Sequence, residues 1–380
     1  MAPEFLYLHV PFCVRRCSYC DFAVDVARTP PLGAWLDAIG AELAGVMEAE
    51  GAARPLRIRT LYVGGGTPSL LGAGAMAALR RRLEPYVRLG DDVEWTVEAN
   101  PESFSVELAV AWREAGVNRV SLGVQTFDER VLRWMGRLHG ADGAVRAAEA
   151  AAKAGIENWS LDLIFGLPAR LGRDWAADVE RALALDPAHV SLYGLTAEPA
   201  TPLGRWVREG RERLADEETY EAEYLFAAER FTAAGFEHYE VSNFARPGRE
   251  SRHNAAYWSG AAYLGLGPSA HSYLPPVRRW NLRDWAAYRS AVAEGRPPVE
   301  SREAVTGAAL RLERTWLALR TRAGLRREGW SPAQEAMVAG WVDRGWAEWT
   351  PGGVRLTPGG WLLLDRLTVE FDGAACAASA

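Results

Sequence analysis

The feature that most constrains the fold is an alternation of strand-like and helix-like segments over the first half of the chain. Short apolar runs rich in β-branched residues have the length of strands, and amphipathic helical patterns separate them. The strand-like runs are residues 5–10, 60–63, 93–97, 119–124, 159–165 and 189–195, and the helical patterns are 34–49, 73–87, 106–115, 142–154 and 175–184. This order predicts a parallel sheet with right-handed crossovers. Six such units predict an α/β fold, an incomplete (β/α)6 TIM-like barrel.

The rest of the chain changes in pattern and composition. A long helical pattern at 217–234 is followed by a mixed stretch rich in aromatic residues, Gly and Pro, and the cluster at 295–298 marks a boundary. Helical patterns at 307–322 and 331–344 and short strand-like runs at 347–349 and 354–356 then predict a small winged-helix-like α+β domain. We therefore expect a barrel at 1–235, a connecting region at 236–300, a C-terminal domain at 301–372 and a disordered tail at 373–380.

Composition and charge exclude several classes of protein. None of the apolar runs in the 380 residues approaches the roughly 20 residues that cross a bilayer. The first residues also lack the basic start and apolar stretch of a secretory signal, so we expect a cytoplasmic protein without a transmembrane segment. The net charge is -6, and residues 305–372 hold nine Arg against eight acidic residues, which argues against nucleic acid as a partner.

Three of the four cysteines lie within eight residues, directly after the first strand-like run. Such a cluster in a cytosolic chain indicates metal binding or redox chemistry rather than disulfides. Zinc usually takes four protein ligands, and no fourth ligand is evident beside Cys13, Cys17 and Cys20, so a four-iron cluster with one open iron fits better. A structural zinc loop and three unrelated thiols are the alternatives. Cys376, in an Ala/Ser tail, is interpreted as a stray thiol.

Glycines and polar residues at the ends of later strands are further candidates for a site. Gly64-Gly65-Gly66-Thr67-Pro68 follows the second strand, and glycines let a backbone approach a ligand closely. Glu98 ends the third strand, where it can pair with an ammonium group or act as a solvated or helix-capping acid. Asp162 lies within an apolar strand, so it either faces a ligand or belongs to a buried pair. Gln125 and Arg137 offer amide and guanidinium groups.

These motifs together resemble a known superfamily. Tyr7-Leu-His-Val-Pro-Phe-Cys13, followed by Cys17 and Cys20, is similar to the signature of radical S-adenosylmethionine (SAM) proteins, in the branch of oxygen-independent coproporphyrinogen III oxidase. The resemblance covers nearly the whole chain. It implies that the three cysteines hold a [4Fe-4S] cluster that takes an electron from a donor and cleaves SAM to a radical. It also implies a SAM site, with one or two molecules, formed by Tyr7, Tyr19, Gly65, Gly66, Thr67, Glu98, Gln125, Arg137 and Asp162.

Within this branch, the sequence resembles a heme-chaperone group more than the oxidase. The oxidase has a fourth cysteine where this chain has Phe22, and a long N-terminal extension where only six residues precede Tyr7. Residues 252–258 contain the His-Asn-x-x-Tyr-Trp motif that is typical of the chaperone group. This makes His253 a candidate heme ligand, with Tyr257 and Trp258 able to pack against a porphyrin, although a hydrogen-bonded structural histidine is the alternative. His271 is a second candidate ligand.

The sequence therefore predicts a heme chaperone that binds a [4Fe-4S] cluster, SAM and heme. We expect it to deliver heme to respiratory hemoproteins and to contact membranes only peripherally, through these acceptors. The alternatives are a radical enzyme that acts on coproporphyrinogen III or another tetrapyrrole, and a binding protein whose cluster never forms radicals. No catalytic residue is predicted.

Overall fold

The computed structural model describes residues 2–49, 51 and 55–377. Its centre is a twelve-stranded sheet with the strand order β14-β13-β12-β11-β1-β4-β5-β6-β7-β8-β10-β9. Six strands that follow one another along the chain pair in parallel: β1 (Phe5–Val10), β4 (Leu56–Gly65), β5 (Val87–Ala99), β6 (Arg119–Gln125), β7 (Trp159–Phe165) and β8 (His189–Gly194). Because β14 and β9 end the sheet without pairing to each other, the sheet stays open. The expected α/β fold with an incomplete barrel is confirmed.

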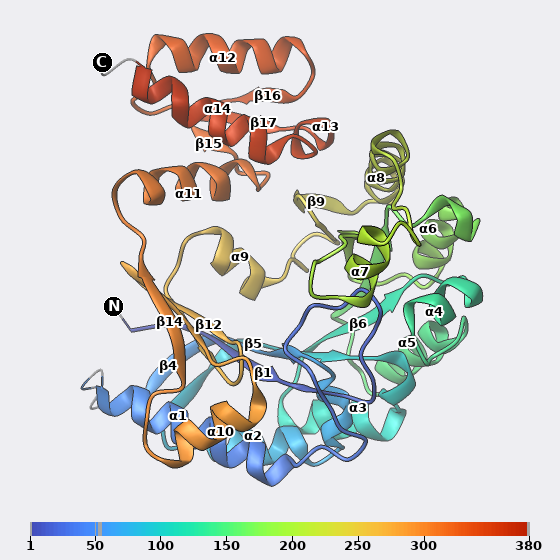
Figure 1. Ribbon diagram of the computed structural model, residues 1–380, viewed down its shortest axis with the longest axis vertical. Helices are drawn as coiled ribbons and strands as arrows, with labels where there is room; N and C mark the ends of the chain where they lie inside the picture. Colours follow the sequence, from blue (N-terminus) through green and yellow to red (C-terminus); the bar gives the residue numbers. More distant parts are fainter. Residues whose placement is uncertain (1, 50, 52–54, 378–380) are drawn as a thin grey trace.

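Helices connect these strands and lie on the outer side of the sheet (Figure 1). The crossovers contain α1 (Leu32–Ala49), α2 (Ala75–Leu83), α3 (Val106–Ala115), α4 (Glu129–Met135), α5 (Gly143–Lys153) and α6 (Trp175–Ala184), with the 3-10 turns η1 (Pro68–Leu71), η2 (Pro101–Ser103) and η3 (Ala169–Leu171). Their apolar faces and the sheet form one core around the fully buried Trp35, Trp95 and Trp112. Strands β4 and β5 begin earlier than expected, because Leu56 and Ile58 pair with the start of β5.

The stretch 236–300, expected as a connecting region, extends the sheet at both edges. After α7 (Pro202–Arg208) and α8 (Glu217–Ala233), β9 (Glu237–Glu240) and β10 (Asn243–Ala245) add to β8. Helix α9 (Arg252–Trp258) leads to β11 (Tyr263–Leu266), which pairs in parallel with β1. The edge continues with β12 (His271–Leu274), β13 (Val277–Asn281), α10 (Trp285–Ala293) and β14 (Val299–Ala304). The pairing of β11 with β1 joins segments far apart in sequence, so local patterns do not reveal it.

The C-terminal part has its own small core and lies at the top of Figure 1. It consists of α11 (Gly307–Leu319), β15 (Leu325–Arg326), α12 (Pro332–Asp343), β16 (Ala347–Thr350), β17 (Gly353–Leu356), α13 (Pro358–Trp361) and α14 (Leu364–Ala377). Its three strands form an antiparallel sheet, as a winged-helix-like α+β unit requires. Helix α14 continues five residues into the tail expected to be disordered, where alanines favour helix, and 378–380 lie outside the described residues. Among the described residues, no helix has the length and apolar character needed to cross a membrane.

A buried carboxylate ties α1 to the extended edge of the sheet. Glu42 accepts hydrogen bonds from the Tyr288 hydroxyl at 2.5 Å, the Asn281 amide at 2.6 Å and the Gly267 backbone N–H at 2.8 Å. Burial raises the pKa of the Glu42 carboxyl to about 7, while the three donors act in the opposite direction. The protonation of this one group is therefore linked to folding.

We expect Glu42 to lower the free energy of unfolding as the pH rises from its unfolded pKa of 4.5 to about 7. The folded state keeps the Glu42 proton in this window and the unfolded state releases it, so higher pH favours unfolding. The contribution is at most about 3 kcal/mol. Denaturant titrations across this pH range, on the wild type and on Glu42→Gln, isolate it as the difference between the two pH profiles. Parallel profiles would contradict the assignment.

Candidate functional site

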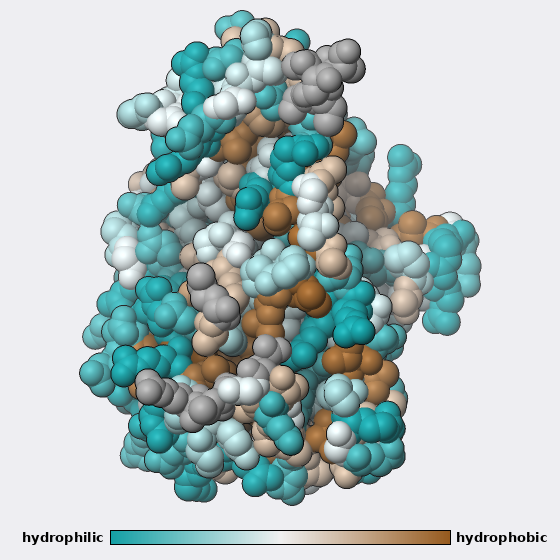
Figure 2. Space-filling model, turned by 90° about the vertical axis from the view of Figure 1, so that its left-hand side faces the viewer, coloured by the Kyte–Doolittle hydropathy of each residue, from teal (hydrophilic) through white to brown (hydrophobic). Residues whose placement is uncertain are grey.

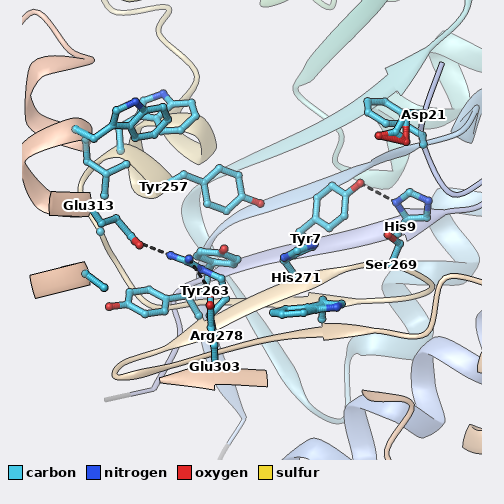
Figure 3. Close-up of a pocket in the computed structure, with 18 of the residues that line it drawn as sticks. Tyr7, His9, Asp21, Tyr257, Tyr263, Ser269, His271, Arg278, Glu303 and Glu313 are labelled. Carbon is cyan, nitrogen blue, oxygen red and sulfur yellow. Dashed lines mark hydrogen bonds and ion pairs between the residues drawn. The ribbon is translucent and has the colours of Figure 1, made fainter. Parts of the chain in front are cut away.

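Two adjoining cavities lie at the carboxyl ends of the parallel strands. The smaller measures about 420 Å³ and contains the cysteine loop. The larger measures about 1210 Å³ and lies between the sheet and the C-terminal helices α11 and α14 (Figure 3). Asp21, Phe22, Gly65 and Glu98 line both cavities. The cysteine loop thus separates two spaces that a ligand can enter.

The cysteine loop is closed by a short two-stranded sheet. Strand β2 (Phe12–Cys13) pairs in parallel with β3 (Asp25–Val26), and Cys13, Cys17 and Cys20 all line the smaller cavity. Burial raises the pKa of the Cys13 thiol to about 11. Among the described residues, no three His, Cys, Asp or Glu side chains are arranged to hold a single metal ion. The three thiols line the same cavity, where together they can hold an inorganic cluster.

A chain of polar side chains surrounds the cysteines. The Thr67 hydroxyl lies 3.2 Å from Cys13 Sγ and accepts a hydrogen bond from the Asn100 amide at 3.2 Å. Arg137 donates to Asn100 Oδ1 at 2.7 Å and lies 4.0 Å from Cys17 Sγ. The guanidinium thus places positive charge where thiolates and a cluster would carry negative charge. The sequence singled out Thr67 and Arg137 but missed Asn100; its position two residues after Glu98 was the available signal.

Two glycines around the end of β4 line the cavity, and they also lie too close to other protein atoms to carry a side chain. Gly65 and Gly66 line the smaller cavity, as expected. A Cβ atom on Gly65 would lie 2.4 Å from the His9 ring, and one on Gly66 would lie 2.6 Å from the Phe12 carbonyl oxygen. Gly65 also has a φ of +110°, which disfavours any other residue. Close packing of β1 and of the start of the cysteine loop against the end of β4 therefore explains these glycines without a ligand.

Two acids face the smaller cavity, and among the described residues no basic side chain is bonded to either of them. Glu98 accepts hydrogen bonds from the Tyr62 hydroxyl at 2.7 Å and the Gly65 N–H at 2.9 Å, and burial raises its pKa to about 7. Asp162 accepts from the Ser121 hydroxyl at 3.1 Å, and burial raises its pKa as well. Asp162 lines the smaller cavity, and its role toward a ligand stays a prediction. Both carboxylates can accept hydrogen bonds from a cationic or hydroxylated ligand.

The remaining expected SAM residues divide between the two cavities. Gln125 lines the smaller cavity. Its φ is +72°, a strained backbone conformation, and it lies where the register of the β6–β7 pairing shifts. Such an irregularity changes the direction of the side chain relative to a regular strand. Tyr19 lines the same cavity from the cysteine loop. Tyr7 instead lines the larger cavity, where its hydroxyl lies 3.0 Å from His9 Nδ1. Alternation along β1 places Tyr7 on the face of the sheet opposite Leu6 and Leu8, which pack in the core under the helices.

His253 lies in the interior and lines neither cavity. It is 1% exposed, and its Nδ1 lies 2.6 Å from Thr60 Oγ1 while its Nε2 lies 2.8 Å from the Tyr257 hydroxyl. Burial lowers the pKa of the imidazole to about 3. Because both ring nitrogens are bonded to the protein, the geometry supports the structural alternative for His253 and not its expected role as a heme ligand.

The other two residues of the motif do reach the larger cavity. Tyr257 lies edge-on to Tyr263, with 4.6 Å between ring centroids. Trp258 lies under the guanidinium of Arg320, 4.0 Å from the ring centroid, and Arg320 forms an ion pair with Glu240 at 2.9 Å. The motif therefore joins α9 to the sheet, to the cavity and to the C-terminal part of the chain.

Comparison with known proteins assigns the chain to a family. The model of the radical SAM superfamily matches residues 7–182. Over 379 residues the chain is 38% identical to the heme chaperone HemW of Mycobacterium tuberculosis, covering 98% of this chain and 95% of that protein. The chain belongs to the HemW family of radical SAM proteins. HemW of Bacillus subtilis is 35% identical over 323 residues, covering 85% of this chain and 84% of that protein.

A solved structure shares the architecture of this HemW family member. Coproporphyrinogen III oxidase (HemN) from Escherichia coli, described as a radical SAM enzyme, matches with a TM-score of 0.80 over 98% of this chain and 90% of that chain. Its sequence identity is 22%, so the likeness concerns the fold alone. The resemblance inferred from the cysteine motif is thus confirmed at the level of the superfamily, the branch and the family.

Proposed function

We propose that this protein is a heme chaperone that binds heme in the larger cavity and passes it to hemoproteins, including respiratory ones. The cavity carries the proposal: its volume of about 1210 Å³ exceeds the roughly 300–1,000 Å³ of ordinary ligand pockets. Aromatic faces suit a flat porphyrin. Those that line it are Tyr7, Phe22, Tyr257, Trp258, Tyr263, Tyr273, Trp280 and Trp316. The proposal places the protein in the cytoplasm, with membrane contact only through its acceptors.

We further propose that the smaller cavity holds a [4Fe-4S] cluster through Cys13, Cys17 and Cys20, with SAM beside it. When bound, these groups supply one-electron reductive chemistry, with the electron coming from an external donor. Arg137 stabilises negative charge at the cysteines, and Glu98 and Asp162 accept hydrogen bonds from the ammonium and hydroxyl groups of the ligand. Tyr19, Gly65, Gly66, Thr67 and Gln125 form the remaining walls.

Phe22 supports the chaperone over the oxidase. Its side chain is 59% exposed and lines both cavities. The sequence resemblance places a fourth cysteine of the oxidase at this position. An apolar side chain at the junction of the two cavities provides contact area for a porphyrin and cannot act as a metal ligand or a redox group.

Anaerobic assays on the reconstituted protein test the proposed function. We expect heme to change the visible spectrum in a saturable way and to move from the loaded protein to an apo-hemoprotein. Coproporphyrinogen III, supplied with SAM and reductant, should remain unconverted. Conversion at enzymatic turnover would instead establish the oxidase, and a spectrum unchanged by heme would reject the chaperone.

A further inference from the structure

The larger cavity contains a histidine whose imidazole is free. His271 lies on β12 and lines the cavity next to Tyr7 and Ser269 (Figure 3). Neither of its ring nitrogens forms a hydrogen bond or ion pair with another described residue; its contact is the stacked ring of Trp280, with 5.7 Å between centroids. A neutral imidazole nitrogen that faces a cavity is a strong ligand for heme iron.

The other five histidines of the chain are excluded either by their hydrogen bonds or by their position. Three use both ring nitrogens in hydrogen bonds to protein atoms, at 2.6 to 3.0 Å: His9, His189 and His253. The remaining two lie outside both cavities: His139 and His238. Elimination therefore leaves His271 as the histidine that can bind iron in the larger cavity.

Tyr257 and Tyr263 of the same cavity are weaker candidates. Iron binds the phenolate form of tyrosine, and burial raises the pKa of Tyr257 and of Tyr263, which keeps both hydroxyls protonated. The Tyr257 hydroxyl is also bonded to His253. In contrast, burial and the nearby Arg278 lower the pKa of His271, which favours the neutral imidazole that binds a metal.

The walls around His271 match a planar molecule with apolar edges. Trp280 supplies a flat aromatic surface beside it, at an interplanar angle of 21°. A second wall, from α11 and α14, supplies Leu312, Leu317 and Val369, and Val369 is 63% exposed. Figure 2 shows apolar surface exposed between the C-terminal part and the rest of the molecule. A bound porphyrin would cover apolar area that a soluble monomer otherwise leaves in water.

We propose that His271 is an axial ligand of heme iron, with the porphyrin lying between the β12–β13 hairpin and helices α11 and α14. This inference rests on the heme-binding function proposed above. The imidazole donates a nitrogen lone pair to the iron, and no electron or proton is exchanged.

The arginines that line the cavity are already paired with carboxylates, which suits a heme that the protein must later release. Arg278 is paired with Glu303 at 3.1 Å and Glu313 at 2.5 Å, and Arg283 is paired with Asp21 at 3.0 Å. Heme propionates would have to compete with these carboxylates. The iron–histidine bond and apolar contact therefore hold the heme, and its charged edge stays weakly bound.

Two variants of the full chain test the assignment. Ferric heme is titrated into the wild type, His271→Ala and the matched control His253→Gln, which can still form side-chain hydrogen bonds. Visible, electron paramagnetic resonance and resonance Raman spectra report the ligand of the iron. We expect His271→Ala to lose the spectral signature of histidine ligation and to bind heme roughly tenfold or more weakly. Added imidazole should restore this signature in His271→Ala. The control His253→Gln should keep the wild-type signature.

The possible results distinguish an error in the assigned iron ligand, His271, from an error in the proposed heme-binding function. Histidine ligation that persists in His271→Ala, or is lost only in His253→Gln, would overturn the role of His271 and leave heme binding standing. A wild-type chain that shows no spectral response to heme would reject the proposed function itself. Circular dichroism of each variant establishes that its fold is retained, which the exposed position of His271 favours.

Discussion

Replacing Cys17 with serine should leave the protein without its iron–sulfur cluster. Cys17 is one of three free thiols that line the smaller cavity, and a cluster held by three cysteines has no spare protein ligand. The iron content after anaerobic reconstitution should therefore fall from about four atoms per chain to almost none. Iron and sulfide analysis, together with visible absorption, measures the change.

Cys376→Ser provides the matched control for this experiment. Cys376 is the one cysteine outside the cluster motif, and its side chain lies outside the described residues. This variant should keep the wild-type iron content and absorption. If Cys17→Ser retained its iron, or if both variants lost it equally, the assignment of the cluster to Cys13, Cys17 and Cys20 would be wrong.

Replacing Arg320 with alanine should destabilise the junction between the barrel and the C-terminal part by about 3–5 kcal/mol. Glu240 is 0% exposed, and Arg320 pairs with it at 2.9 Å. Without Arg320 the buried carboxylate has no counter-charge, and Trp258 loses the guanidinium that covers its ring. Because burial already raises the pKa of Glu240, the loss should be smaller at low pH, where this group takes up a proton. Denaturant unfolding at two pH values measures both effects.

Arg322→Ala serves as the control at the same junction. Arg322 also joins the two parts through ion pairs, to Glu237 and to Glu250 at 2.9 Å, but its side chain is 45% exposed. Exposed ion pairs contribute roughly 0–1 kcal/mol, so this variant should unfold close to the wild type. Equal losses in the two variants would show that burial of the Glu240–Arg320 pair is not what stabilises the junction.

Most of the barrel could be predicted from sequence because each βα unit carries its own local pattern. Strands β1 and β7 match their expected limits, since their apolar runs end at Pro11 and at Gly166. The place of strand β11 in the sheet could not be predicted in this way. Tyr263 pairs with Phe5 of β1, and the energy of that pairing depends on a neighbour far away in the chain.

The candidate site shows the same division. The spacing of Cys13, Cys17 and Cys20 was enough to predict a metal site in one loop, because residues that are close in sequence are also close in space. Asn100 was missed because its importance comes from contacts with Thr67 and Arg137, which the fold brings together from two other loops.

The sequence by itself determined the parallel order of the barrel, the cysteine loop and the family, because these depend on periodicity and on spacing within short segments. Only the tertiary structure decided which histidine presents unbonded ring nitrogens to the larger cavity, because His9 also lines it but is hydrogen-bonded at both nitrogens. His253 turns into the interior against Thr60, whereas His271 is left free between the β12–β13 hairpin and the C-terminal helices. The direction of an imidazole depends on packing between distant segments, and no local pattern of residues records it.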